Sequence, residues 1–149
     1  QYANLDKITD FNNEIAPART FVFLHELEFL AKNNLIKGGD LDNAIVIIDR
    51  KVSQAELDHL AEIFNKPKVK VQPAGVLNNI DLNFSNEPAR HKLLDIMGDL
   101  ALIGQPIQGK VIATRPGHYA NNQFARLIRS KIKKDKLIYD SFHWINLLS

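Results

Sequence analysis

The spacing of apolar residues along the chain predicts four helices. Phe23, Leu27 and Leu30 recur every three or four positions, which is typical of an amphipathic helix over residues 19–33. Three further helices are expected from Ser53 onward, from Pro88 to Gly104, and from about 119 to 134. The last helix is expected to turn a set of apolar side chains inward: Phe124, Leu127, Ile128 and Ile132.

Local chemistry supports the ends of these helices. Ser53 and Glu56 have the spacing of a capping box, in which the serine accepts from a backbone N–H and the glutamate reaches back. Pro88 suits the first turn of a helix, where a missing N–H costs nothing. Gly104 can adopt the left-handed conformation that ends a helix.

Other stretches have the pattern of β-strands. The β-branched run at 44–48 is typical of a strand buried on both faces, Val69 and Val71 alternate with lysines, and residues 107–114 precede a Pro-Gly turn. The order of helices and strands predicts an α/β class, an α+β two-layer sandwich with a mixed β-sheet against a layer of helices. Residues 51–84 have the pattern of a strand–helix–strand insertion.

Composition narrows the class without changing this picture. The 149 residues are 45% hydrophobic and 24% charged, with a formal net charge of +2, which is ordinary for a globular domain and gives no reason to expect nucleic acid as a partner. The chain has no cysteine, so disulfides and cysteine metal sites are excluded. No segment approaches the ~20 apolar residues of a transmembrane helix.

One polar stripe crosses the otherwise apolar helix after Pro88. His91, Asp95 and Asp99 follow one another at intervals of four residues, so each advances only ~40° around the helix. Imidazole and carboxylate both suit zinc, and two such residues at i, i+4 can reach one ion. The alternative is an exposed face with a surface ion pair. A catalytic zinc normally has three protein ligands, and no other histidine completes the set by local spacing.

Two further positions could carry chemistry. His118 follows Gly117 at an expected strand-to-helix turn, where it could act as a general acid, although a helix N-terminal residue without a role is the simpler interpretation of the position alone. The hydroxyl of Thr20 opens an expected helix, and the alternative there is a simple N-cap.

The end of the chain is basic. Its cluster could contact acidic partners, although a solvated helix face is the simpler interpretation. No aromatic residues interleave with it, which argues against a surface that stacks single-stranded nucleic acid. The cluster consists of Arg126, Arg129, Lys131, Lys133, Lys134 and Lys136.

Four blocks in order resemble a known family. They read EIAPARTF at 14–21, GGDLDNA at 38–44, ARHKLLDIMGDL at 89–100, and GH at 117–118. Together they resemble the second domain of UDP-3-O-acyl-N-acetylglucosamine deacetylase, a zinc-dependent hydrolase of lipid A synthesis in Gram-negative bacteria. The resemblance covers roughly residues 4–136. Asp40 and Asn43 resemble the Bacteroidetes-type branch, in which a 3-hydroxyacyl-carrier-protein dehydratase is often fused downstream.

The resemblance implies roles for the polar residues. His91 and Asp95 resemble two of the three zinc (Zn2+) ligands. His118 resembles the histidine that stabilises charge and protonates the leaving amine, and Asp99 the acid that faces and holds it. Thr20 resembles the hydroxyl that stabilises the oxyanion.

Substrate contacts are implied as well. Lys92 and Phe21 resemble residues that touch the UDP-linked acylated amino sugar. The resemblance also implies a hydrophobic passage for the acyl chain. The alternative is that its residues simply pack in the core. They are Ile36, Leu41, Ala44 and Val46.

The family's third zinc ligand and its glutamate base belong to a first domain that this chain lacks. Residues 1–137 are therefore expected to form the second domain, with 138–149 a tail. The isolated chain is expected to be inactive, and the whole enzyme to work in the bacterial cytoplasm, near the inner membrane. The alternative function is a non-catalytic binding module that uses its basic end.

Overall fold

The computed structural model describes residues 1–32 and 43–145, without the side chains of 28, 31, 32 and 134–145. It divides into two compact units, Gln1–His91 and Lys92–Ser149. The boundary falls within the helix α4 (Glu87–Ala101), which carries the polar stripe. Each unit is described by itself below.

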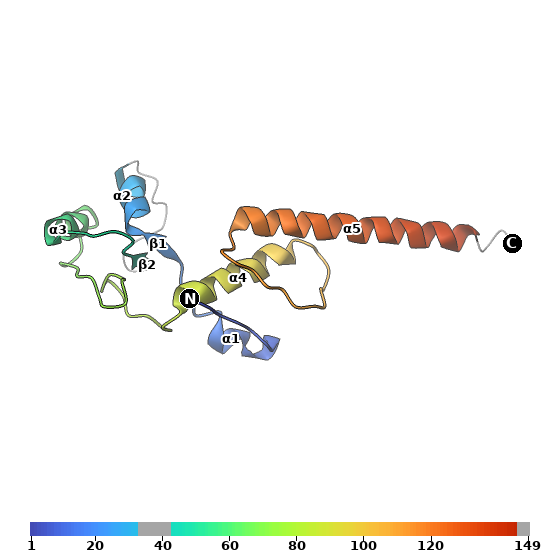
Figure 1. The fold of residues 1–149 in the computed structure, drawn as a ribbon, viewed down its shortest axis with the longest axis horizontal. Helices are drawn as coiled ribbons and strands as arrows, with labels where there is room; N and C mark the ends of the chain where they lie inside the picture. Colours follow the sequence, from blue (N-terminus) through green and yellow to red (C-terminus); the bar gives the residue numbers. More distant parts are fainter. Residues whose placement is uncertain (33–42, 146–149) are drawn as a thin grey trace. The chain divides into compact units, whose positions relative to one another are not determined.

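The first unit combines short helices with a small parallel sheet (Figure 1). Strand β1 pairs with β2 in parallel, and Phe21 lies opposite Ile45. Val76 adds an isolated antiparallel bridge to Ile47. The elements are η1 (Ile8–Asp10), α1 (Phe11–Glu14), β1 (Phe21–Phe23), α2 (Leu24–Lys32), β2 (Ile45–Ile47) and α3 (Gln54–Ile63).

Apolar side chains from α2, β2 and α3 form the core of this unit. The cluster consists of Leu24, Leu27, Val46, Leu57, Leu60, Ala61, Val69 and Leu77. The predicted capping box at the start of α3 is confirmed, because Ser53 and Glu56 exchange both hydrogen bonds. The backbone N–H and hydroxyl of Ser53, with the Arg50 guanidinium, lower the pKa of Glu56 to about 2.

The second unit contains the rest of α4 and the long helix α5 (His118–Ile145). Its core is small and is built from Leu100, Ile103 and Ala125, with Ile128 and Ile132 packed against them. Gly104 has the predicted left-handed conformation, at φ +76°, in the turn after α4. Among the described residues, no helix combines the length and the apolar character needed to cross a membrane.

The α+β class is confirmed, but two predicted elements are wrong. Residues 21–23 are a strand rather than the start of a helix, because Phe21, Val22 and Phe23 suit extended backbone and gain hydrogen bonds from β2. Residues 107–114 form no strand, since no described backbone pairs with them. The described sheet is accordingly parallel rather than mixed.

Two smaller expectations also differ from the structure. Val71 forms only an isolated bridge to Leu77 instead of belonging to a full strand. Phe124 and Leu127 are exposed, at 45% and 54%, rather than inward. The buried Ala125 and the partly buried Ile128 and Ile132 form the apolar stripe of α5, and a helix presents one such stripe to a small core.

Candidate active site

In the first unit, His91 is fixed by a backbone contact. Its Nδ1 lies 3.0 Å from the carbonyl oxygen of Ala18. A carbonyl only accepts, so Nδ1 must carry the proton and the lone pair lies on Nε2. The ring of Phe21 approaches that of His91 edge to face, with centroids 6.4 Å apart. Metal-binding histidines are commonly oriented by such a bond to the second ring nitrogen.

A buried ion pair holds the segment before β1 against α4. The Glu87 carboxylate is fully buried and accepts from the backbone N–H of Arg19 at 2.9 Å and from its Nε at 2.8 Å. The backbone N–H of Asn83 donates to the second oxygen at 2.6 Å. Burial raises the pKa of Glu87, but the hydrogen bonds from Arg19 and Asn83 outweigh it, so the pKa lies below its ordinary value. The bond to Glu87 also raises the pKa of Arg19.

Sequence reasoning missed Glu87. A glutamate in the first turn of a helix is usually explained by the helix dipole, and such a residue is usually exposed. The block at 14–21 contains Arg19, but nothing local shows that its partner lies 68 residues away. Only tertiary contact reveals the pair.

The remaining predicted residues of the first unit lie at the sheet. The exposed Thr20 directly precedes β1, and its carbonyl accepts from the Ile45 N–H at 2.9 Å. Because a strand and not a helix follows Thr20, the N-cap alternative for this residue is wrong.

Two residues of the predicted acyl passage also lie at the sheet. The Ala44 carbonyl accepts from Asn79 Nδ2 at 2.9 Å, and Val46 is buried in the core cluster. The passage assigned to these residues stays a prediction. Its other two members, Ile36 and Leu41, lie outside the described residues, as does Asp40.

The second unit brings an acid–imidazole pair together. His118, the first residue of α5, places Nδ1 at 2.9 Å and 3.2 Å from the two carboxylate oxygens of Asp99 on α4. The resemblance implies this contact, although the catalytic role it implies stays a prediction. The buried Asn121 donates from Nδ2 to the same carboxylate at 2.9 Å.

A second carboxylate lies on the other side of the imidazole. The Nε2 of His118 is 3.9 Å from Asp95 Oδ1, and Lys92 Nζ is 2.8 Å from Asp95 Oδ2. His118 thus presents Nδ1 to one carboxylate and Nε2 toward another. Its side chain is 65% exposed, whereas those of Asp95 and Asp99 are only 11% and 13% exposed.

The environment keeps Asp99 ionised. Burial raises the pKa of its carboxyl, but hydrogen bonds from Asn121 and His118 outweigh this, with help from the charges of His118 and Lys92. The pKa of Asp99 therefore lies below its ordinary value. An ionised Asp99 accepts a hydrogen bond from the Nδ1–H of His118, and the other ring nitrogen, Nε2, faces Asp95.

His91 and Asp95 lie four residues apart on α4, as the stripe requires. Over residues 1–32 and 43–145, no three histidine, cysteine, aspartate or glutamate residues are grouped so that they could hold a metal ion. The donors of His91 and Asp95 suit zinc chemically, and the fixed Nδ1 proton of His91 fits a ligand that binds through Nε2.

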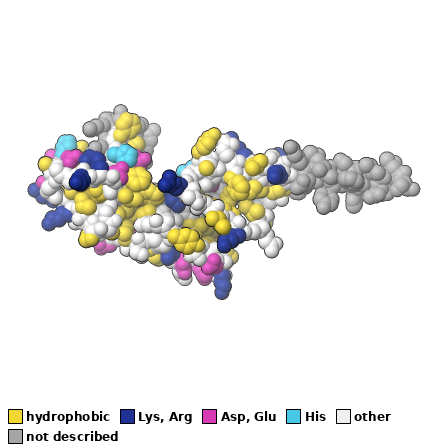
Figure 2. Space-filling view, viewed as in Figure 1, with side chains coloured by type: hydrophobic (Ala, Val, Ile, Leu, Met, Phe, Trp, Pro, Cys, Tyr) yellow, Lys and Arg dark blue, Asp and Glu magenta, His cyan; other side chains and the backbone are white. Residues whose placement is uncertain are grey.

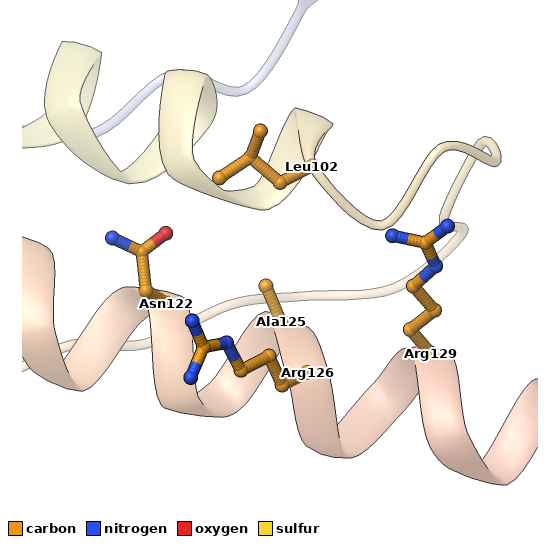
Figure 3. Close-up of a pocket in the computed structure, with 5 residues that line it drawn as sticks. All are labelled: Leu102, Asn122, Ala125, Arg126 and Arg129. Atoms are coloured by element: carbon orange, nitrogen blue, oxygen red, sulfur yellow. The ribbon is translucent and has the colours of Figure 1, made fainter.

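A separate cavity lies along α5 (Figure 3). It has a volume of about 360 Å³, and none of the predicted catalytic, metal-binding or sugar- and acyl-binding residues lines it. Arg126 and Arg129 contribute two cations, and the Oδ1 atom of Asn122 is buried without a hydrogen-bond partner. Leu102 and Ala125 complete the lining. In the space-filling view, hydrophobic and basic side chains reach the surface side by side in this unit (Figure 2).

Comparison with known proteins matches this chain to one family. A model of the family described as LpxC, UDP-3-O-acyl N-acetylglycosamine deacetylase, matches residues 1–69 and 64–130. The chain is 53% identical over 136 residues to the bifunctional enzyme LpxC/FabZ of Porphyromonas gingivalis, which covers 91% of this chain and 29% of that protein. The protein of the same name from Bacteroides thetaiotaomicron is 53% identical over 133 residues, or 89% of this chain and 29% of that protein.

A relative with a simpler name is also similar. The UDP-3-O-acyl-N-acetylglucosamine deacetylase of Syntrophotalea carbinolica is 41% identical over 118 residues, which is 79% of this chain and 30% of that protein. The chain thus spans about three-tenths of the length of these relatives. The family match covers most of the chain and includes the helix with His91, Asp95 and Asp99 as well as His118. The chain therefore belongs to the UDP-3-O-acyl N-acetylglycosamine deacetylase (LpxC) family.

Proposed function

We propose that this chain supplies part of the active site of a hydrolase that removes the N-acetyl group from UDP-3-O-acyl-N-acetylglucosamine. One observation carries the proposal: the hydrogen bond between His118 and Asp99, one helical turn beyond Asp95. A histidine held by a carboxylate that is mostly shielded from solvent is suited to general acid catalysis. It lies beside a carboxylate of the kind that binds zinc.

His91 and Asp95 are the proposed zinc ligands from this chain, and the third ligand is proposed to come from the rest of the protein. Zinc held by these residues would lower the pKa of a bound water and so supply the nucleophile. The bond from Nδ1–H of His91 to the Ala18 carbonyl orients the ring and makes Nε2 the proposed zinc-binding atom. The pair of Lys92 with Asp95 orients that carboxylate.

His118 performs the proton transfer in this proposal. Asp99 accepts the Nδ1–H bond, so His118 Nε2 delivers its proton to the amine that leaves when the amide C–N bond breaks. Thr20, with its exposed side chain, is the proposed donor to the oxyanion. Lys92 and Phe21 are the proposed contacts to the UDP-linked sugar, and Ala44 and Val46 belong to the proposed acyl passage.

The rest of the protein is proposed to contain a first deacetylase domain and, as the names of two relatives suggest, a fused acyl-carrier-protein dehydratase. A bacterial cytoplasmic location, close to the inner membrane, is proposed because the substrate carries both a nucleotide and an acyl chain.

A comparison of the isolated chain with the full-length protein tests this function. We expect the isolated chain to bind zinc weakly and to release no acetate, because it offers two of the three ligands of a catalytic site. The full-length protein is expected to bind one zinc tightly and to turn over. Calorimetric titration with zinc and an acetate-release assay measure both properties. Tight stoichiometric zinc and turnover in the isolated chain would contradict the division of the site.

The cavity along α5 favours a second candidate function, the binding of acidic groups. Arg126 and Arg129 line one cavity, and residues 118–133 contain no aspartate or glutamate to neutralise them. Guanidinium groups bind phosphate well because several N–H donors point the same way.

A titration with inorganic pyrophosphate measures this binding. Changes in the NMR signals of α5 are expected to saturate and to disappear in Arg126→Ala/Arg129→Ala, because the two guanidiniums supply the donors. Lys110→Ala, an exposed cation that does not line the cavity, is the control. An equal response in the double variant and in the wild type would contradict phosphate binding in the cavity and favour the interpretation that the basic residues form a solvated helix face.

A further inference from the structure

Asn121 is the third member of the Asp99 hydrogen-bond cluster. It lies one turn into α5, and only 8% of the residue is exposed. Its Nδ2 is 2.9 Å from Asp99 Oδ2, the oxygen that also lies 2.9 Å from His118 Nδ1. The same oxygen therefore accepts from both side chains.

The geometry limits how Asp99 can move. A carboxylate bound only by His118 could rotate about its side-chain torsions and exchange its oxygens. The bond from Asn121 comes from a buried side chain on the same helix as His118, with the Asn121 backbone N–H bound to Gly117 at 3.0 Å. Asn121 thus fixes the carboxylate relative to the first turn of α5, which also carries the imidazole of His118.

We propose that Asn121 is a positioning residue, which holds the Asp99 carboxylate so that it keeps the proton of His118 on Nδ1 and directs Nε2 toward the substrate. The effect of Asn121 on the reaction rate rests on the proposed function. The control of the His118 tautomer by Asn121 does not, because it can be observed without turnover. Burial supports it as well, because a buried amide donor that meets a carboxylate stabilises the ionised form.

The kinetic test uses the full-length protein. Asn121→Ala is expected to lower kcat by about 10- to 100-fold, the value of one hydrogen bond to a charged group, with little change in KM. Asn121→Asp keeps the shape but replaces the donor with an acceptor, and should lose at least as much. Gln123→Ala, an exposed amide residue on the same helix, is the control and should change kcat less than about twofold.

A double-mutant cycle separates positioning from packing. In an Asp99→Ala background, Asn121→Ala should cause no further loss of kcat, because its target is gone. If Asn121 only supports the packing of α5, the loss persists in that background and overturns the proposal.

The tautomer of His118 gives a readout independent of activity. In protein labelled with ¹⁵N-histidine, at a pH where the ring is neutral, His118 should be protonated at Nδ1, and Asn121→Ala should shift the population toward Nε2–H. An unchanged tautomer overturns the proposal even in an active enzyme. An inactive wild-type protein in which the tautomer still depends on Asn121 would instead refute the proposed function alone.

Discussion

Replacement of His118 with alanine in the full-length protein is expected to slow deacetylation by roughly 10²–10⁴-fold while zinc content stays unchanged. The expected loss is large because His118 is the proposed proton donor to the leaving amine, and its exposed imidazole is hydrogen-bonded to Asp99. Its Nε2 lies 3.9 Å from Asp95, beyond hydrogen-bond distance, so its removal takes no donor from that carboxylate. Acetate release and metal analysis of the purified variant measure the two quantities.

His91→Ala is the matched comparison for His118→Ala. It removes the other histidine of the proposed site, but the proposed ligand rather than the proposed acid. Zinc and activity are expected to fall together in this variant. Loss of zinc in His118→Ala would mean that His118 is a ligand and that the roles of the two histidines are exchanged.

Replacement of Glu87 with alanine is expected to destabilise the chain by about 3–5 kcal/mol, the cost of removing one partner from a buried ion pair. The carboxylate is fully buried, and its loss takes the shared acceptor from the Asn83 N–H and from the backbone N–H and Nε of Arg19, which keeps its Nη2 bond to the Asp81 carbonyl. Urea unfolding followed by circular dichroism measures the change. Glu62→Ala, an exposed glutamate of α3, is the control and should cost less than about 0.5 kcal/mol. A loss under 1 kcal/mol for Glu87→Ala would contradict the role of the pair.

The Glu87 pair also predicts a pH dependence of stability. The folded pKa of Glu87 is lowered, so its contribution is complete above the unfolded pKa of about 4.3 and is lost as the pH falls through the folded pKa. The free energy of unfolding should therefore decline below about pH 4. Glu87→Gln keeps the shape without the titrating group, so its decline should be smaller over the same range.

Local patterns predicted the parts of this chain that local forces stabilise. The capping box at Ser53 involves residues three apart, so the sequence alone contains both partners. The stripe of His91, Asp95 and Asp99 follows from helical periodicity once α4 is recognised. The contact of Asp99 with His118 came from the resemblance of whole blocks rather than from spacing.

Local patterns failed where pairing decides the outcome. Residues 21–23 have both helical spacing and strand-forming side chains, and the parallel partner at β2 selects the strand. The stretch 107–114 has a strand composition but finds no partner among the described residues, and an unpaired strand has no hydrogen bonds to stabilise it. The prediction that Phe124 and Leu127 point inward was wrong because a small core occupies only one side of α5.

Residue identity and short spacing were enough to predict the family, the helix with the polar stripe, and the chemical types of the candidate ligands and acid. Only the folded chain reveals which groups meet: Glu87 with Arg19, the Ala18 carbonyl with His91, and Asn121 with Asp99. The Glu87 and Ala18 contacts join residues 68 and 73 apart in the chain. The lowered pKa values of Glu87 and Asp99 depend on burial and hydrogen bonding, which arise only when distant segments of the chain come together.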